Sequence, residues 1–465
     1  MTEKIPTLIK KLMELKSINP YTGECIATVA EFSARQVQAV FRQSEKAFHF
    51  WKYFPVARRA DLVRKTGLIL HANKELYART ITSEMGKPLR ESIAEIEKCA
   101  WVCSWYAENG PAFLRNEEIL TDAKHSYVRY APLGNILAIM PWNFPFWQVF
   151  RCAVPALLAG NCIVLKHASN VQQCAALIED IFLKAGCPEG VFKNIPVSSE
   201  KVAGLIAHPT VKAVSFTGSA EAGSEVASLA GRHLKKTVLE LGGSNPFLVL
   251  NDADLPAAVE TGFRSRMQNA GQSCIAAKRF IVHQSVYDEF VEMFLQKVQK
   301  LVVSDPMNTG TEMGPLAGIE HAVKVERQVT ESQYLGATVL YGGHRQGAFF
   351  EPTVMINVTA DMPVFREEVF GPVAVIIKAP DEPNMLKLAG ASPFGLGVTV
   401  FTSDLERAEK MIPWFKDGAV FINEMVKSDP RLPFGGTEKS GYGRELSWHG
   451  IREFVNVQTV YIAER

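Results

Sequence analysis

The sequence predicts an α/β protein with a doubly wound parallel sheet. Between residues 135 and 241, short apolar runs typical of buried strands alternate with helix-like segments. The runs are Ile136–Met140, Cys162–Leu165, Val191–Ile195, Val211–Phe216 and Val238–Leu241. Strands that alternate with helices form parallel sheets, which bind ligands beyond the carboxyl ends of their strands. Residues directly after these runs are therefore the first candidates for a binding site.

The first hundred residues look helical. Val37–Phe48 has apolar residues at helical spacing, and Ala57–Leu76 is a second amphipathic run. Glu84–Pro88 follows with a glycine and a proline that end a helix. We expect this region to contribute packing and no chemistry.

Strand-like patterns occur outside the central region as well. They are found in Asn116–Tyr130 and in Val455–Ile462. Met307–Val364 offers glycine-rich turns and apolar strands, and we assign none of its residues to chemistry.

The composition predicts a soluble cytoplasmic protein of two or three domains. A net charge of +1 gives no electrostatic case for nucleic acid or for an anionic membrane. Met1–Pro6 lacks the apolar core of a secretion signal, and prolines and Arg151 interrupt the longest apolar region, residues 131–165. Eight cysteines without a compact spacing pattern favour reduced thiols.

A cysteine and a glutamate are the candidates for chemistry. Cys274 follows Gly271-Gln-Ser, and Glu240 ends an apolar run directly before two glycines. Free cysteine is usually core packing and a lone glutamate is usually solvated, so each residue alone has an ordinary structural explanation. A thiol with a carboxylate base is, however, an activated nucleophile, and the polar neighbours of Cys274 fit poorly in a core.

Six motifs make the sequence resemble the NAD(P)-dependent aldehyde dehydrogenases, and they occur in the family's order. They are Pro141-Trp-Asn-Phe-Pro145, Phe216-Thr-Gly-Ser219, Glu240-Leu-Gly-Gly243, Gly271-Gln-Ser-Cys274, Glu367-Glu-Val-Phe-Gly-Pro372 and Pro433-Phe-Gly-Gly436. The resemblance implies three parts. Residues 1–114 and 131–241 would form a Rossmann-like cofactor domain, residues 242–444 an α/β catalytic thiol domain, and residues 115–130 and 445–465 a small β oligomerisation arm. Such an arm implies a homodimer or homotetramer.

The resemblance also implies that NADP or NAD binds beside the thiol. The Thr217–Gly223 turn opens a helix whose N-terminus could hold a pyrophosphate, although a plain turn is the alternative. Glu368 would hold the nicotinamide ribose with Phe370 nearby, and a surface acidic pair is the alternative. The full implied set is Met140, Pro141, Trp142, Lys166, Ser169, Thr217, Gly218, Ser219, Leu241, Glu368 and Phe370.

Ser169 bears on the choice between the two dinucleotides. NAD-preferring relatives commonly have a glutamate here, which binds the ribose hydroxyls; this chain has a neutral residue near Lys166. Without that carboxylate a 2′-phosphate is not repelled, and Lys166 could attract it. We therefore expect NADP to be accepted, and NAD remains possible.

By the resemblance, three residues carry the reaction. Cys274 attacks the aldehyde carbon, and the Asn143 amide joins the Cys274 backbone N–H in stabilising the oxyanion. Glu240 takes the thiol proton through water and later activates the water that hydrolyses the thioester. In an unknown protein Asn143 would be interpreted as a helix cap. Glu445 could extend the proton path, and no metal is expected.

The substrate prediction depends first on Arg151. By the resemblance it lies on the helix that lines the substrate tunnel, where an arginine in the semialdehyde-oxidising branch binds a distal carboxylate. A structural ion pair is the alternative. Gln268 and Cys152 replace an arginine and a lysine common in succinate semialdehyde dehydrogenases, yet Gln268 and Ser428 can still donate hydrogen bonds. The expected substrate-binding set is Arg151, Trp147, Gln268, Ser428 and Phe434.

Oxidation of succinate semialdehyde, or of a similar short semialdehyde, is the first functional hypothesis. Another small aldehyde, such as lactaldehyde or betaine aldehyde, is the second. A coenzyme A-acylating enzyme is disfavoured because a hydrolytic base such as Glu240 would destroy its thioester. The third hypothesis, a non-enzymatic protein of the same fold, conflicts with the intact set of Cys274, Glu240 and Asn143.

Overall fold

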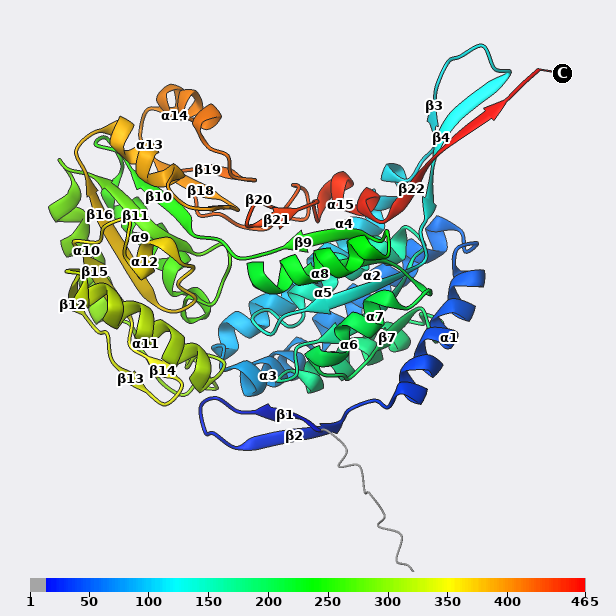
Figure 1. Cartoon of the computed structure of the whole chain (residues 1–465), viewed down its shortest axis with the longest axis horizontal. Helices are drawn as coiled ribbons and strands as arrows, with labels where there is room; N and C mark the ends of the chain where they lie inside the picture. The colour runs from blue at the N-terminus through cyan, green and yellow to red at the C-terminus, as the bar shows by residue number, and fades with distance from the viewer. Residues whose placement is uncertain (1–13, 465) are drawn as a thin grey trace, which may run out of the picture.

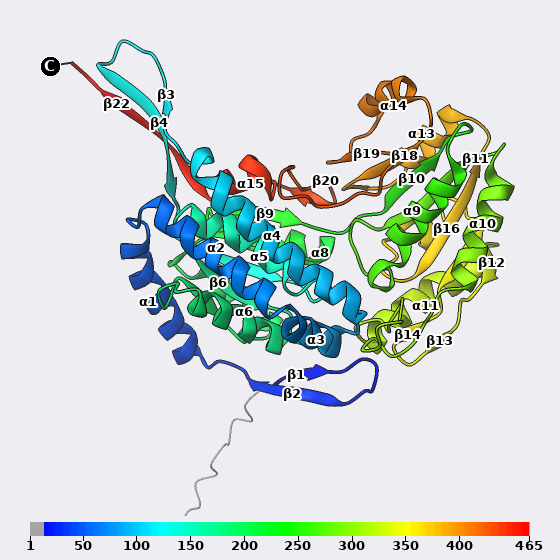
Figure 2. The same ribbon diagram turned by 180° about the vertical axis from the view of Figure 1, so that it is seen from behind.

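The computed structural model describes residues 14–464, which form two sheet-containing lobes and a projecting β arm (Figure 1). The view from behind shows the same two lobes, with the arm rising from the lobe that contains α1 to α8 (Figure 2). Within the described residues, no helix is both long and apolar enough to cross a membrane.

The first lobe is built on a six-stranded sheet in the order β21-β9-β8-β5-β6-β7. All neighbours pair in parallel except β21, which pairs antiparallel with β9. Every residue of β5 and β6 is buried, which explains their continuous apolar sequences. The strands are β5 (Asn135–Met140), β6 (Cys162–His167), β7 (Phe192–Asn194), β8 (Val211–Thr217), β9 (Lys236–Glu240) and β21 (Gly441–Tyr442). All five predicted runs are therefore strands, and the fold class is confirmed.

Helices pack around this sheet, and capping residues define some of their ends. Ser33 starts the first helix with a reciprocal capping box to Gln36, and Gly86 ends the third in the left-handed conformation at φ 78°. The helices are α1 (Ala34–Trp51), α2 (Val56–Ala72), α3 (Lys74–Met85), α4 (Leu89–Phe113), α5 (Trp147–Leu158), α6 (Gln172–Lys184), η1 (Ser199–Lys201), α7 (Val202–Ala207), α8 (Ala220–Arg232) and α15 (Ser447–Glu453).

The helical prediction for the first hundred residues is wrong for residues 14–30, and residues 1–13 lie outside the described part of the chain. β1 (Glu14–Ile18) and β2 (Cys25–Ala30) form an antiparallel hairpin. Exposed and buried residues alternate along β1, with Leu15 and Ser17 buried. The Ser17 hydroxyl donates a hydrogen bond of 2.6 Å to Glu84, so a contact distant in sequence holds this strand.

The second lobe contains a seven-stranded sheet in the order β12-β15-β16-β11-β10-β18-β19, antiparallel only between β12 and β15. Its strands are β10 (Asn245–Val249), β11 (Ala277–His283), β12 (Thr338–Tyr341), β15 (Thr353–Ile356), β16 (Val373–Ala379), β18 (Val398–Phe401) and β19 (Val420–Ile422). The short strands β13 (Arg345–Gln346), β14 (Phe349–Phe350), β17 (Phe394–Gly395) and β20 (Thr437–Glu438) form two-stranded pairs, β13 with β14 and β17 with β20.

Eight helical segments belong to this part of the chain. They are α9 (Leu255–Met267), η2 (Gln268–Gly271), α10 (Tyr287–Gln299), α11 (Ile319–Tyr334), α12 (Pro363–Arg366), α13 (Glu382–Gly390), α14 (Leu405–Met411) and η3 (Ile412–Trp414). The prediction of turns and strands for Met307–Val364 missed α11. Its buried Ala322, Val325, Val329 and Ser332 recur at helical spacing, which is the signal that was overlooked.

The arm consists of β3 (Glu117–Glu118), β4 (His125–Pro132) and β22 (Val455–Ile462). β22 pairs antiparallel with β4 over all eight of its residues, so the two strand-like segments predicted far apart in sequence lie side by side. The division into domains at residues 114, 131, 241 and 444 stays a prediction.

Candidate active site

Cys274 lies where two cavities meet. The first cavity is lined by residues that follow β5, β8 and β9 together with part of α11. The second cavity lies between α4, α5 and the loops around Gln268 and Ser428. Cys274 and Gln148 line both cavities. A ligand in either cavity would therefore meet the same cysteine.

The loop before Cys274 has an unusual backbone that other segments hold in place. Asn269, Ala270 and Gly271 all have positive φ angles, 53°, 51° and 73°. A side chain at Gly271 would place a Cβ 2.2 Å from the Gly371 carbonyl oxygen, so only glycine fits there. The Asn269 backbone N–H donates to Glu91 at 2.8 Å. This contact ties the cysteine loop to α4.

The Cys274 carbonyl is fixed by two donors. Asn245 Nδ2 donates to it at 2.6 Å and Lys278 Nζ at 3.1 Å. Lys278 also pairs with Glu368 at 2.6 Å, which connects the loop to the first cavity. A Cβ on Gly243 would lie 2.8 Å from the Cys274 carbonyl oxygen, which explains the second glycine of the Glu240-Leu-Gly-Gly motif.

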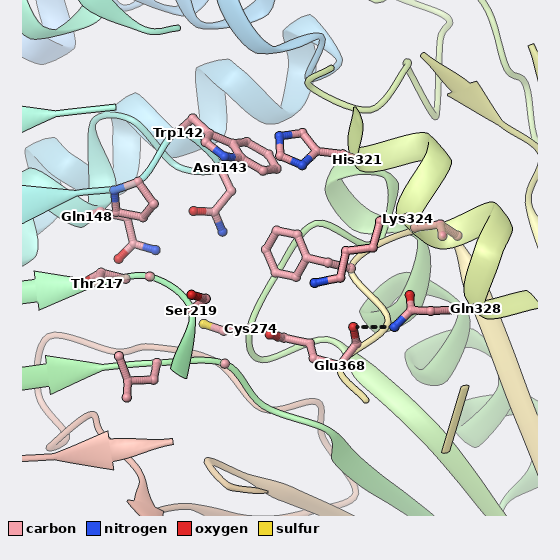
Figure 3. Close-up of a pocket in the computed structure, with 16 residues that line it drawn as sticks. Trp142, Asn143, Gln148, Thr217, Ser219, Cys274, His321, Lys324, Gln328 and Glu368 are labelled. Atoms are coloured by element: carbon pink, nitrogen blue, oxygen red, sulfur yellow. Dashed lines mark hydrogen bonds between the residues drawn. The ribbon is translucent and has the colours of Figure 1, made fainter. Parts of the chain in front are cut away.

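Two N–H donors lie at the thiol, as expected for an oxyanion-binding site. The Asn143 side-chain amide donates one hydrogen bond of 3.1 Å to the Gln272 carbonyl, which leaves its second N–H available. Among the described residues, no acceptor lies within hydrogen-bonding distance of the Cys274 backbone N–H. The two side chains lie on the same cavity (Figure 3).

Burial favours the protonated form of both proposed reacting groups. It raises the pKa of the Cys274 thiol to about 11, although the positive charges of Arg151 and Lys278 act in the opposite direction. Burial also raises the pKa of Glu240 well above its usual value, and the Arg151 charge opposes this. Glu240 is 2% exposed, lines neither cavity, and its Oε1 has no hydrogen-bond partner among the described residues.

Most of the predicted cofactor residues are brought together around the first cavity. They are Pro141, Trp142, Thr217, Gly218, Ser219, Leu241, Glu368 and Phe370. Met140 and Lys166 are buried and do not line it. Ser169 lines a different cavity beside the turn between β1 and β2.

The first cavity suits a ligand that has both hydrogen-bond donors and an anionic group. Thr217 Oγ1, Gln148 Oε1 and Gln328 Oε1 are buried there without a hydrogen-bond partner among the described residues. Ser219 caps the N-terminus of α8, where backbone N–H groups favour a phosphate. These residues fit a pyridine dinucleotide.

Sequence reasoning missed the contribution of α11 to this cavity. His321, Lys324 and Gln328 line it, and the His321 ring lies 4.4 Å from the Trp142 ring, centroid to centroid. Figure 3 shows His321 beside Trp142, and Gln328 Nε2 donates a hydrogen bond of 3.2 Å to the Glu368 carbonyl. All three residues lie on α11, so they were missed together with that helix.

All five predicted substrate residues line the second cavity, namely Arg151, Trp147, Gln268, Ser428 and Phe434. Arg151 is paired there with Glu445, and both side chains are almost fully buried, 2% and 4% exposed. Its guanidinium also lies 4.5 Å from the centre of the Phe434 ring. Arg151 therefore forms a structural ion pair, which is the alternative to substrate binding that the sequence analysis leaves open.

The second cavity also contains charged residues from α4 that were not predicted. Glu91, Glu95 and Lys98 line it, and Lys427 joins them from the loop before Ser428. The region containing α4 was expected to contribute packing alone. The spacing of Glu91, Glu95 and Lys98 by three to four positions on one helix was the available signal.

Comparisons with known proteins give a matching family and several similar proteins. The sequence model of the Aldehyde dehydrogenase family matches residues 9–460. A probable succinate-semialdehyde dehydrogenase (NADP(+)) of Synechocystis sp. is 45% identical over 454 residues, covering 97% of this chain and 100% of the relative. The Escherichia coli protein named succinate semialdehyde dehydrogenase (NAD(P)+) Sad is 45% identical, with 96% and 97% covered. The crystal structure of succinic semialdehyde dehydrogenase from Streptococcus pyogenes with NADP+ superposes with a TM-score of 0.94 at 35% identity, covering 97% of this chain and 100% of that chain.

Proposed function

This chain belongs to the aldehyde dehydrogenase family, and we propose that it oxidises succinate semialdehyde, or a similar short semialdehyde, to succinate with NADP or NAD. The position of Cys274 carries the proposal. This residue lines one cavity that fits a dinucleotide and a second cavity that contains cationic side chains. The names of the relatives support the same substrate and the same cofactors. We also propose that the protein is a cytoplasmic homo-oligomer.

In the proposed mechanism, Cys274 attacks the aldehyde carbon and forms a thiohemiacetal. Asn143 and the Cys274 backbone N–H donate to the oxygen that becomes negative, and one such donor contributes roughly 3 kcal/mol to transition-state stabilisation. The nicotinamide cofactor supplies the hydride acceptor. Glu368, held by Lys278, and the polar side chains of α11 would hold that cofactor against Cys274.

Glu240 supplies the base in this proposal. A thiol with a pKa of about 11 does not ionise by itself at neutral pH, so its proton must pass to an acceptor during attack. A buried carboxyl with a raised pKa accepts protons readily, and water would connect it to the sulfur. Once the thioester has formed on Cys274, the same carboxylate activates the water that releases succinate.

Reduction of NADP or NAD by the purified protein tests the proposal. Succinate semialdehyde should be oxidised faster than lactaldehyde or betaine aldehyde, and Cys274→Ala should abolish turnover. Glu240→Gln should give at most one equivalent of reduced cofactor per active site and then stop, because the thioester is not hydrolysed. Full turnover by Cys274→Ala, or equal rates with all three aldehydes, would contradict the proposal.

A further inference from the structure

Lys98 projects from α4 into the second cavity, where the thiol also lies. Its Nζ lies 4.4 Å from the centre of the Trp147 ring and donates a hydrogen bond of 2.8 Å to Ser428 Oγ. Among the described residues, no carboxylate lies within ion-pair distance of this ammonium. A substrate anion could therefore become its partner.

The other cations of the cavity, and the carboxylate of Glu95, already have partners of opposite charge. Arg151 pairs with Glu445, and Glu95 pairs with Lys87. Lys427 pairs with Glu424 at 2.9 Å. Because these charges are compensated, Lys98 is the cation of this cavity whose charge a substrate could still balance.

Ser428 is arranged to donate a hydrogen bond at the same place. Its Oγ accepts from Lys98 Nζ at 2.8 Å and from Trp147 Nε1 at 3.1 Å. With both lone pairs occupied, the hydroxyl proton must point to a further acceptor, and the described residues provide none within hydrogen-bonding distance. A carboxylate accepts hydrogen bonds and donates none, so it fits both Lys98 and Ser428.

We propose that Lys98, with Ser428, binds the distal carboxylate of the aldehyde substrate and sets the preference for anionic aldehydes. This inference rests on the proposed function and identifies the residue that selects the substrate. It assigns to Lys98 the task that the sequence had suggested for Arg151.

The electrostatic surroundings of Lys98 support this role. Burial lowers the pKa of Lys98 to about 8, and repulsion from Arg151 of α5 adds to the effect. Cys99 and Glu95 of α4 and Asp429 of the following loop act in the opposite direction. A bound carboxylate would stabilise the ammonium form. Affinity for an anion should accordingly be retained at neutral pH and fall as the pH rises through about 8.

The test compares succinate semialdehyde with pentanal, an uncharged aldehyde of similar length. Lys98→Met should lower kcat/KM for succinate semialdehyde about tenfold or more, chiefly through KM, and leave the value for pentanal nearly unchanged. Lys98→Arg should retain most of the preference because it keeps the charge. Lys427→Met is the matched control, since it removes a lysine from the same cavity whose charge Glu424 already balances.

Inhibition by succinate measures binding of the carboxylate independently of the oxidation of the aldehyde. For the wild type, the inhibition constant should rise above about pH 8, whereas for Lys98→Arg it should stay level because guanidinium keeps its proton. A preference for succinate semialdehyde that survives Lys98→Met, or that Lys427→Met removes instead, would overturn the assignment. A wild type without any preference over pentanal would overturn the proposed function as well.

Discussion

Arg151 and Glu445 form a buried ion pair next to the reacting groups. Both side chains are nearly inaccessible, and the Arg151 charge acts on the pKa values of Glu240 and Cys274. Removing one partner of such a pair leaves a charge buried without compensation, which costs more than an exposed pair contributes. The pair therefore belongs to the framework of the site.

Glu445→Gln tests this structural role. It should lower the free energy of unfolding by about 3 kcal/mol or more, because Arg151 stays charged in a buried place. Urea unfolding followed by circular dichroism measures the change. Glu438→Gln is the control: its partner Lys416 is partly exposed, so the loss should be below about 1 kcal/mol. Equal losses in the two variants would show that Arg151 does not depend on Glu445.

The residue that follows the end of α8 has an unusual backbone angle. Leu234 follows the C-cap residue His233, has a φ of 53° and is 96% exposed. A left-handed conformation costs an ordinary residue roughly 1 kcal/mol and costs glycine little. The side chain of Leu234, being exposed, provides little packing in return.

Leu234→Gly should therefore raise the free energy of unfolding by about 1 kcal/mol. Urea unfolding measures the gain, and activity should not change because Leu234 lines neither cavity. Leu335→Gly is the matched control at the end of α11, where an exposed leucine has a φ of −85°. That variant should be neutral or less stable. A gain of the same size at Leu335 would contradict the backbone explanation.

At the level of elements, the sequence predicted the strands of the first sheet better than it predicted two other segments, the β1–β2 hairpin and α11. The run before Met140 is buried at every position and those before Phe216 and Leu241 at most positions, because both faces of the sheet are covered. The β1–β2 hairpin and α11 were missed. Their patterns are short or half polar, and each depends on contacts with residues distant in sequence, such as that of Ser17 with Glu84.

On the scale of the whole molecule, the arm leaves apolar side chains uncovered. Val457, Tyr461 and Ile462 of β22 are 62%, 53% and 45% exposed, and Leu120 beside β3 is fully exposed. Exposed apolar side chains on a projecting sheet are typical of an interface between subunits. This pattern supports the proposed oligomer, in which the arm joins copies of the chain.

Replacing Val457 and Tyr461 together by glutamate should reduce the mass of the assembly, because the two residues lie on one face of β22 and burying their charges is costly. Light scattering after gel filtration measures that mass. Gln458→Glu adds one charge on the opposite face of the same strand and should leave the mass unchanged. An unchanged mass in the double variant would exclude this face of β22 as the interface.

The sequence by itself determined the fold class, the family and the presence of a thiol, a carboxyl and an amide suited to acyl chemistry. These follow from local patterns: apolar runs, glycines that allow close approach, and short motifs in a fixed order. Only the tertiary structure decided which cation is compensated. The sequence suggested Arg151 as the anion-binding residue and did not single out Lys98. The neutralisation of a buried charge depends on which segments pack against it, and folding brings Glu445 to Arg151 and no carboxylate of the described residues to Lys98.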